Sequence, residues 1–446
     1  MRYLFGFLCV CALGLMPLIG CGETTGSMPE CESAEDCDDG NECTADTCTD
    51  GKCDSTPVAD GTACGDDAGT CQQESCRVAC DEQGIRDAIA AGGGPYTFGC
   101  DGPKTVVTAE EIVIDNDVIL DGEGNLTVDG NDEHRVFSVS RGVMAALHGV
   151  AVNKGVATSC CAGGIDNRGT LTLTDSMVSG NEGGIHIIEG ATLTMNNSTV
   201  LGNTAYEGGG IVNDGTLTMT NCTVRGNMVT GGGGGGIYNE RILTLTDSAV
   251  LENQARALED EFGIHGGNGG GISNSGTAAL TNSTVSHNSA EQEGGGIFNF
   301  GTFTMTSSTV SGNTTDGIHF ARGGPEDPLN FAITSSIIDG DCSMDDGLGL
   351  VSNGYNIESP GNTCGFDEAK GDQPGVTEMQ LNLGPLADNG GPTQTHKPGD
   401  GGLGEGSAAI DQIPGDACDL TEDQRGEPRP ETGGSMCDVG SVEVQP

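Results

Sequence analysis

Residues 208–227 read GGGIVNDGTLTMTNCTVRGN, and the pattern returns at 234–253 (GGGIYNERILTLTDSAVLEN) and 294–313 (GGGIFNFGTFTMTSSTVSGN). Each copy has an isoleucine after a glycine run, an apolar–polar alternation, and a closing asparagine. The anchoring isoleucines are Ile165, Ile185, Ile211, Ile237, Ile272, Ile297 and Ile318. A period in the low twenties with several short strands per unit is typical of a solenoid, in which each repeat stacks on its neighbours.

The alternation inside each repeat predicts very short strands with one buried face. Leu217 and Met219 flank Thr218, and Leu243 and Leu245 hold the same places in the next repeat. Period-two alternation is the pattern of a half-buried strand. No two-residue hairpin turn separates the strands, so each is expected to pair with its equivalent one coil later, about 4.8 Å away. The sequence therefore predicts an all-β fold, a single-stranded parallel β-helix.

Polar residues also recur at fixed places. Asparagines two residues after the anchor are expected to hydrogen-bond along a column, which Ile187 interrupts, and Cys222 aligns with serines as a small buried residue. The residue after each anchor is predicted to point outward. His186, Tyr238 and Phe298, with Phe300 two positions further on, are therefore candidates for a shallow ligand-binding face; the alternative is a mixed, solvated surface. The predicted outward column is Asp166, His186, Val212, Tyr238, Ser273, Phe298 and His319.

The first twenty residues, MRYLFGFLCVCALGLMPLIG, have the charged start and short apolar core of an export signal. The signal ends in Leu-Ile-Gly-Cys, which resembles the bacterial lipobox. That resemblance implies that Cys21 is acylated and becomes the first residue of the mature chain. We expect residues 1–20 to be removed, residues 21–30 to form a lipidated tether, and the protein to lie at the outer membrane or cell surface, with the lipid bilayer as its partner.

Residues 31–79 form a predicted disulfide-rich module. Eight cysteines lie between 31 and 76, and the segment has almost no large apolar residue, so disulfides must hold it together. The pairing of these eight stays open. The segment has no histidine, which argues against a zinc site. Its many acids, among them Asp36 and Glu42, leave a calcium site as an alternative.

A short helix over residues 81–91 is expected to cap the solenoid, because Ile85, Ala88 and Ile89 share one helical face. Cys80 and Cys100 bracket this segment and are a candidate disulfide. The β-helix with its cap is predicted over 80–340. Repeat length varies at one corner, and the longest insertion, 254–268, is read as a loop whose Glu259, Asp260, Glu261 and His265 either bind calcium, contact a partner or are simply solvated.

The GGGIxNxGTLTLTNSTVSGN-like units resemble polymorphic outer-membrane-protein repeats of the pectin-lyase-like superfamily, which implies that the helix is right-handed. The motifs LNLGPLADNGGPTQTH (381–396), SAAID (407–411), DQRGEPRP (423–430) and CDVGSVE (437–443) resemble the terminal region of choice-of-anchor Q proteins, which are surface or secreted. That resemblance makes 341–446 a capping region, in which Cys342–Cys364 and Cys418–Cys437 are candidate disulfides. CDDGNECTADTC (37–48) resembles the Cys-rich repeats of slime-mould matrix proteins.

Composition narrows the function further. A net charge of −49, from 66 acidic and 17 basic residues, excludes nucleic acid as a partner. The catalytic motifs of polygalacturonases are absent as a set, and Arg168, Arg225 and Arg241 are expected in different columns. We therefore expect a non-catalytic surface lipoprotein that contacts glycan or matrix protein and needs no cofactor beyond possible calcium. The alternatives are a polysaccharide lyase or glycoside hydrolase, and a structural envelope protein without a dedicated ligand.

Overall fold

The computed structural model describes residues 31–38, 41–65, 68–72, 74–157, 162–260, 263–322, 331–403 and 406–445. The expected export signal, the tether with Cys21, and Glu261 lie outside these ranges. Within them, no helix is both long and apolar enough to cross a membrane.

The cysteine-rich segment is divided between two compact units. Residues 31–38 and 45–56 belong to the first, and residues 41–44 and 57–445 to the second. The first unit holds the short helix η1 (Ala34–Cys37) and most of the paired strands β1 (Thr44–Thr49) and β2 (Lys52–Pro57). Its disulfides are Cys31–Cys48 and Cys37–Cys53. They take the place of a core, because Cys31 is its one buried residue among those described.

The rest of the cysteine-rich segment is built into the start of the β-helix unit. Strands β3 (Ala63–Cys64), β4 (Gly69–Gln72) and β5 (Ser75–Val78) are antiparallel neighbours, and β5 continues into a parallel pairing with β6 (Gly93–Phe98). Disulfides Cys43–Cys71 and Cys64–Cys76 lie here. The boundary expected after residue 79 therefore does not coincide with the boundary between the two units.

Helix α1 (Glu82–Ala91) lies at this end of the coils. The side chain of Asp81 accepts a hydrogen bond from the Gly84 backbone, and the helix stops at Gly92, whose φ is 70°. The apolar face expected from the sequence is the one that is buried. Cys80 and Cys100 are disulfide-bonded across the element.

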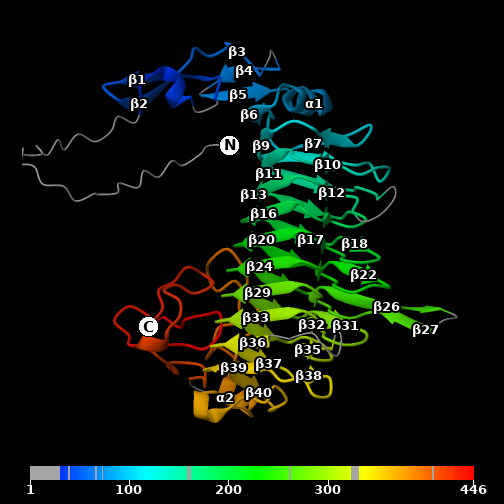
Figure 1. The fold of residues 1–446 in the computed structure, drawn as a ribbon, viewed down its shortest axis with the longest axis vertical. Coiled ribbons are helices and arrows are strands. Elements are labelled where there is room, and N and C mark those ends of the chain that lie inside the picture. The colour runs from blue at the N-terminus through cyan, green and yellow to red at the C-terminus, as the bar shows by residue number, and fades with distance from the viewer. Residues whose placement is uncertain are drawn as a thin grey trace, which may run out of the picture. The chain divides into compact units, whose positions relative to one another are not determined.

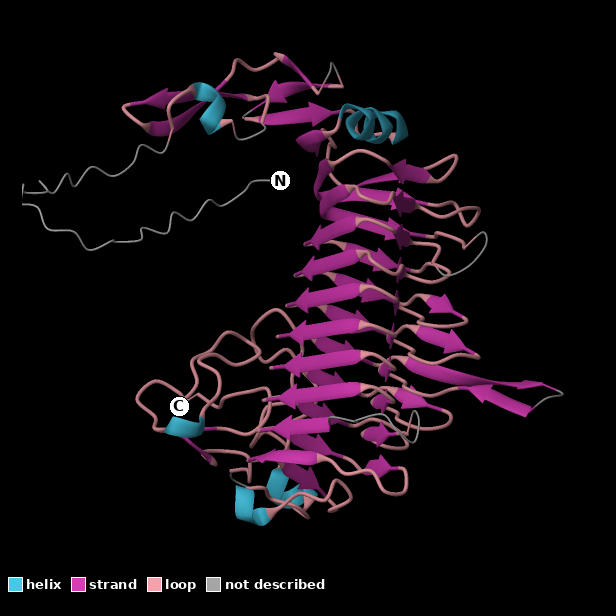
Figure 2. Ribbon diagram, in the orientation of Figure 1, coloured by secondary structure: helices cyan, strands magenta, loops and turns pink. Residues whose placement is uncertain are grey.

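Three parallel sheets form the walls of the β-helix, and each strand pairs with its equivalent in the next coil (Figures 1 and 2). The anchoring isoleucines belong to a ten-stranded sheet. We call it the anchor sheet. Its strands are β8 (Ile112–Ile114), β10 (Phe137–Val139), β12 (Ile165–Asn167), β15 (Ile185–Ile187), β19 (Ile211–Asn213), β23 (Ile237–Asn239), β28 (Ile272–Asn274), β32 (Ile297–Asn299), β35 (Ile318–Phe320) and β38 (Cys342–Met344).

The other two walls start from β9 (Val118–Asp129) and β11 (Met144–Asn153), which pair along both, and from β7 (Lys104–Val107). The long-strand sheet continues as β13 (Thr170–Thr174), β16 (Thr192–Asn196), β20 (Thr216–Thr220), β24 (Ile242–Thr246), β29 (Thr277–Thr281), β33 (Thr302–Thr306), β36 (Phe331–Thr334) and β39 (Val351–Gly354). The short-strand sheet continues as β14 (Met177–Ser179), β17 (Thr199–Leu201), β21 (Thr223–Arg225), β25 (Ala249–Leu251), β30 (Thr284–Ser286), β34 (Thr309–Ser311), β37 (Ile337–Asp339) and β40 (Ile357–Ser359). Coils therefore extend to residue 359, beyond the expected limit of 340.

The core consists of columns of like side chains. Ile211, Ile237 and Ile272 are in register, and all three are fully buried. Cys222 is a buried free thiol in the column of serines, as expected; burial raises its pKa to about 11, so it remains protonated.

The closing asparagines form a continuous buried ladder. Asn227 Oδ1 accepts from the backbone nitrogen and the side-chain nitrogen of Asn203, both at 2.9 Å. Its own amide donates to Val200 O and to Asn253 Oδ1. Each amide thus satisfies a backbone group at a bend that has no sheet partner, which explains why this position recurs.

The insertion at 254–268 is not a plain loop. Strands β26 (Gln254–Asp260) and β27 (Gly263–Gly266) form an antiparallel hairpin. The start of β26 also extends a small parallel sheet with β18 (Thr204–Ala205), β22 (Met228–Thr230) and β31 (Ser289–Ala290). The loop interpretation failed because short, polar strands give little periodic signal until neighbouring coils offer them backbone partners.

The C-terminal region runs back along the β-helix instead of only covering its end (Figure 1). After β40 it contains η2 (Glu368–Lys370), α2 (Glu378–Leu381), η3 (Gly415–Ala417) and the paired strands β41 (Ile413–Pro414) and β42 (Met436–Cys437). Gln424 and Ser441 hydrogen-bond Thr284 of β30, and His396 hydrogen-bonds Ser286. Outward positions of the short-strand sheet are consequently buried in β25, β30 and β34, although they are accessible in β14 and β17.

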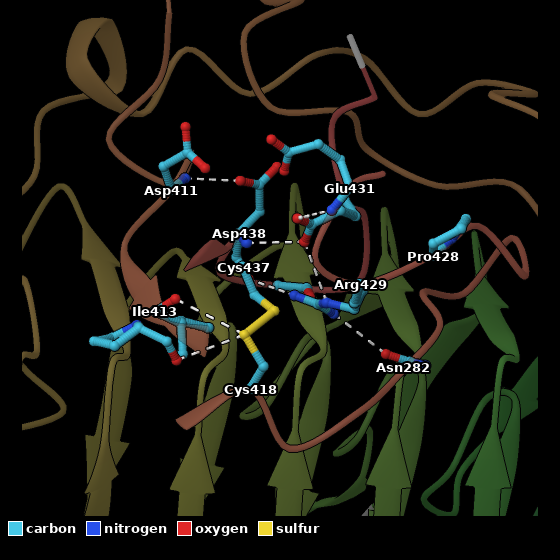
Figure 3. The surroundings of a disulfide bond; sticks show 12 residues. Asn282, Asp411, Ile413, Cys418, Pro428, Arg429, Glu431, Cys437 and Asp438 are labelled. Atoms are coloured by element: carbon cyan, nitrogen blue, oxygen red, sulfur yellow. Dashed lines mark hydrogen bonds and ion pairs between the residues drawn. A yellow bond between two sulfur atoms is a disulfide. The ribbon is translucent and has the colours of Figure 1, made fainter. Parts of the chain in front are cut away.

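A buried ion network holds this segment in place (Figure 3). Arg429 pairs with Glu443 at 3.3 Å, donates to the carbonyls of Asp438 and Gly440, and reaches Asn282 of the β-helix. Burial raises the pKa of Glu443 to about 7 even though Arg429 opposes the shift. The disulfides Cys418–Cys437 and Cys342–Cys364 join the pairs expected for this region.

Replacing Asn227 by alanine should destabilise the β-helix by about 3 kcal/mol, because the buried Asn203 backbone nitrogen loses its acceptor and Val200 O loses the side-chain donor. Asn253 Oδ1 keeps only the Asn227 backbone nitrogen as a donor from that residue. The measurement is the midpoint of chemical denaturation followed by circular dichroism. Asn196→Ala, on the accessible face of β16, is the matched control and should cost less than about 0.5 kcal/mol. Equal losses for both variants would contradict the role assigned to the ladder.

Candidate functional site: an acidic groove at a bend of the β-helix

An open groove of about 530 Å³ lies at the bend between the anchor sheet and the long-strand sheet. Four successive coils contribute to it. Its lining residues are Glu189, Gly190, Ala191, Thr192, Asp214, Gly215, Thr216, Glu240, Arg241, Ile242, Gly276 and Thr277.

Stacking of the coils explains how residues far apart in the sequence come to lie side by side along the groove. The asparagines that end β19, β23, β28 and β32 are in register, so the residues that follow them also lie one per coil. Backbone hydrogen bonds continue this register through the bend, from Glu240 N to Asn213 O and from Phe300 N to Asn274 O. Asp214, Glu240, Ser275 and Phe300 consequently form one column, with Phe300, 37 % exposed, one coil beyond Ser275.

Arg241 supplies the positive charge in the groove. Its guanidinium pairs with Glu189 at 2.5 Å, and both side chains are more than half exposed. Three carboxylates, those of Glu189, Asp214 and Glu240, therefore line the groove against one guanidinium, and its field is negative. Arg168, Arg225 and Arg241 occupy different columns, as expected: Arg168 and Arg241 come one and two residues after an anchor strand, and Arg225 lies in β21. Their ion-pair partners are Asp166, Glu252 and Glu189.

The imidazole of His186 hydrogen-bonds Asp214, one of the acids that line the groove. Its Nδ1 lies 3.1 Å from Asp166 and its Nε2 lies 3.2 Å from Asp214, so both ring nitrogens donate to carboxylates. Burial by itself would lower the pKa of His186, but the two carboxylates outweigh it and raise that pKa. The same contacts, together with Arg168 and Arg135, hold the pKa of Asp166 below its usual value despite burial.

Tyr238 supports the next acid. Its hydroxyl donates to Glu240 Oε1 at 3.1 Å. Burial and the neighbouring carboxylates raise the pKa of Tyr238, so the phenol keeps its proton and remains a donor. The sequence singled out His186 and Tyr238 as possible ligand contacts. In the structure they lie behind the groove and hydrogen-bond the acids that line it, Asp214 and Glu240.

The prediction that the residues after the anchoring isoleucines form an exposed face is wrong. Asp166, His186, Val212, Ser273, Phe298 and His319 are all buried, and Tyr238 is half-buried. Glycine-rich corner segments cover the column, since Gly208 lies against the Val212 side chain and Gly233 against Ser273. Side-chain alternation places a residue on the outer face of its strand, but it does not reveal what the corner insertions fold over.

Phe298 belongs to a separate buried cluster in the coil that follows the last lining residues of the groove. Its ring stacks on His319 at 5.2 Å and meets the edge of Phe300 at 4.8 Å. Glu293, Asp316 and Asp345 surround His319 at 3.4 to 3.9 Å, and they raise its pKa against the effect of burial. Phe298 therefore holds Phe300, the one member of this pair that reaches solvent.

Among the described acids of the hairpin and the cysteine-rich segment, no three gather into a cation site. Glu259 faces Ile264 across the hairpin, and Asp260 faces Gly263. Glu42 accepts a hydrogen bond from Gly65 N. Throughout the described ranges, the groups of three His, Cys, Asp or Glu ligand atoms within 4.8 Å of one another consist of disulfide-bonded cysteines.

The groove can therefore act by hydrogen bonding. Its carboxylates accept from hydroxyl or ammonium groups, Arg241 donates, and the hydroxyls of Thr192, Thr216 and Thr277 do both. Phe300, one coil beyond the lining residues, offers an aromatic surface for a sugar ring.

Comparison with known proteins supports the fold. No protein-family model matches the chain, and no curated protein sequence matches it. The crystal structure of pectate lyase Pel9A matches with a TM-score of 0.50 at 14 % identity, covering 80 % of this chain and 90 % of that one. The chain thus has the right-handed parallel β-helix fold seen in that pectate lyase.

We expect His186 to titrate above its ordinary pKa of 6.5 and its pKa to fall when Asp214 is replaced by asparagine. Because the folded-state pKa is raised, the stabilisation from charged His186 is complete below about pH 6.5 and is lost as the pH rises through the folded-state pKa. NMR of histidine-labelled protein measures both effects. Asp175→Asn, at a different bend, is the control and should leave the His186 titration unchanged.

Proposed function

We propose that this protein is an exported, lipid-anchored surface protein that uses the acidic groove to bind a neutral or amino-sugar polysaccharide without cleaving it. One observation carries the proposal: three coils present Glu189, Asp214 and Glu240 along a groove whose shape is set by the stacked backbone. Hydroxyl-rich polymers offer donors at regular intervals, and a rigid groove avoids the entropy loss of ordering its own side chains on binding.

Charge favours this class of polymer over polyuronates. The groove holds three carboxylates and one guanidinium, in a chain whose net charge is −49. A polymer with a carboxylate on each ring would be repelled by both the groove and the whole molecule. An amino-sugar polymer would instead gain charge-assisted hydrogen bonds from its ammonium groups.

Glu189→Gln combined with Glu240→Gln should weaken binding of partially deacetylated chito-oligosaccharides at least tenfold, since each lost charged hydrogen bond is worth about 1.5–3 kcal/mol. Isothermal titration calorimetry with the full chain is the measurement, and Phe300→Ala should also weaken binding. Glu110→Gln is the matched control, because that acid is 81 % exposed and remote from the groove. Unchanged affinity in the double variant, or tighter binding of polygalacturonate, would refute the proposal.

A polysaccharide lyase is the second candidate. The fold of the pectate lyase and the position of Arg241 beside a carboxylate favour it. Incubation with polygalacturonate, with and without calcium, should release no unsaturated product under the binding proposal. Product that disappears in an Arg241→Ala variant would establish the lyase in its place.

The expected anchor is part of the proposal. The Leu-Ile-Gly-Cys lipobox supports acylation at Cys21, and two or three acyl chains are sufficient for stable membrane attachment. The resemblances to choice-of-anchor Q proteins and to polymorphic outer-membrane-protein repeats point to the same surface location, whether the partner is a glycan or a matrix protein.

Metabolic labelling with a fatty-acid analogue should mark the protein in the membrane fraction, and Cys21→Ser should abolish the label. Cys11→Ser, inside the expected signal, is the control and should retain it. Labelling that persists in the Cys21→Ser variant would exclude the lipobox assignment.

A further inference from the structure

The outer surface of the long-strand sheet carries a regular array of threonines. Strands β13, β16, β20, β24, β29 and β33 are in perfect register and direct three side chains each away from the core. Threonine occupies five of the six positions in each of the three columns. We call these eighteen positions the threonine face: 170, 172, 174, 192, 194, 196, 216, 218, 220, 242, 244, 246, 277, 279, 281, 302, 304 and 306.

The threonine face is accessible and its hydroxyls are free of protein partners. All eighteen positions are partly or fully exposed. Within the described parts of the chain, none of the fifteen threonine hydroxyls is engaged in a hydrogen bond with another residue, unlike Thr284 and Thr309 of the short-strand sheet, whose hydroxyls bond the C-terminal region. The array is therefore available to an external lattice of donors and acceptors.

Charge is excluded from this surface in a protein that has 66 acidic residues. The three positions that are not threonine are Asn196, Ile242 and Ala279, all uncharged. Solubility alone would place acids here, as it does at the bends on either side, where Asp175 and Glu240 lie. Threonine also suits exposed strand positions through its β-propensity, but propensity does not explain the absence of charge across six coils.

The array is geometrically rigid. Successive coils repeat at about 4.8 Å, and side chains on one face of a strand repeat at about 6.6 Å, twice the rise per residue. Stacking keeps such a sheet flat, and Figure 2 shows the long strands one above another with little rotation. A β-branched side chain has few rotamers, so each threonine holds its methyl and hydroxyl in a fixed position.

We propose that the threonine face binds ice. The two repeats of the array are close to those of the oxygen lattice on a prism face of hexagonal ice. Its hydroxyls can occupy lattice positions, while the methyl groups order the water between them. A flat polysaccharide crystal fits less well, since sugar rings stack on aromatic side chains and the eighteen positions include none.

Ice recrystallisation inhibition by the purified full chain tests this inference. Wild-type protein should inhibit at micromolar concentration, and Thr218→Lys with Thr244→Lys, at the centre of the face, should require at least ten times more. Thr199→Lys with Thr223→Lys is the matched control: these threonines are register partners on the short-strand sheet, equally accessible, and should leave inhibition unchanged. Circular dichroism confirms folding, and Thr172→Lys with Thr194→Lys replaces the central pair if that pair does not fold.

A labelled chain should also enter a growing ice hemisphere. Exclusion of the wild-type chain from ice, or equal inhibition by the face variant and wild type, would overturn the proposal. Sedimentation with microcrystalline cellulose is a separate arm, and cellulose binding without ice binding would replace ice by polysaccharide. Thr192, Thr216, Ile242 and Thr277 belong both to the edge column of the threonine face and to the groove lining. Glu189→Gln with Glu240→Gln, which changes only the acids of the groove, should not alter ice binding.

Discussion

The whole molecule depends on one requirement: a three-residue strand cannot satisfy its backbone hydrogen bonds within its own coil. Each strand of the anchor sheet finds its partners only in the coils above and below, as Ile211 does between Ile185 and Ile237. Once the strands pair, equivalent residues must lie over one another. Columns of isoleucine fill the interior, and asparagine ladders satisfy the bends where no sheet exists.

The same stacking creates the two surfaces of functional interest. At a bend, it brings Glu189, Asp214 and Glu240 of three successive coils together along one groove. On the long-strand sheet, it converts one TxTxT segment per coil into a flat array. Neither surface exists in a single repeat, and both are rigid because their positions follow from the backbone register and not from side-chain packing.

The C-terminal region illustrates how tertiary contacts change the meaning of a repeat. Outward positions of the short-strand sheet are accessible in β14 and β17, but in β30 Thr284 bonds Gln424 and Ser441, and Ser286 bonds His396. Small or polar residues such as Ala249 and Thr284 occupy positions that the C-terminal region covers. The buried Arg429–Glu443 pair lies within that segment, and Arg429 also donates to Asn282 Oδ1 of the coils.

The sequence by itself determined the β-helix, because a strict repeat of apolar and polar positions has only one economical way to bury its apolar face. It also determined the core columns and the column of asparagines two residues after the anchor, which are properties of one repeat multiplied, and it determined the capping helix through its apolar face. The tertiary structure alone decided which outward residues stay accessible. Phe298 and His319 are buried and Phe300 is not, because that depends on the fold of corner segments whose glycine-rich sequences carry no period. It also decided that strands β26 and β27 form a hairpin and that β3, β4 and β5 join the β-helix unit, since both depend on the backbone partners that these strands find.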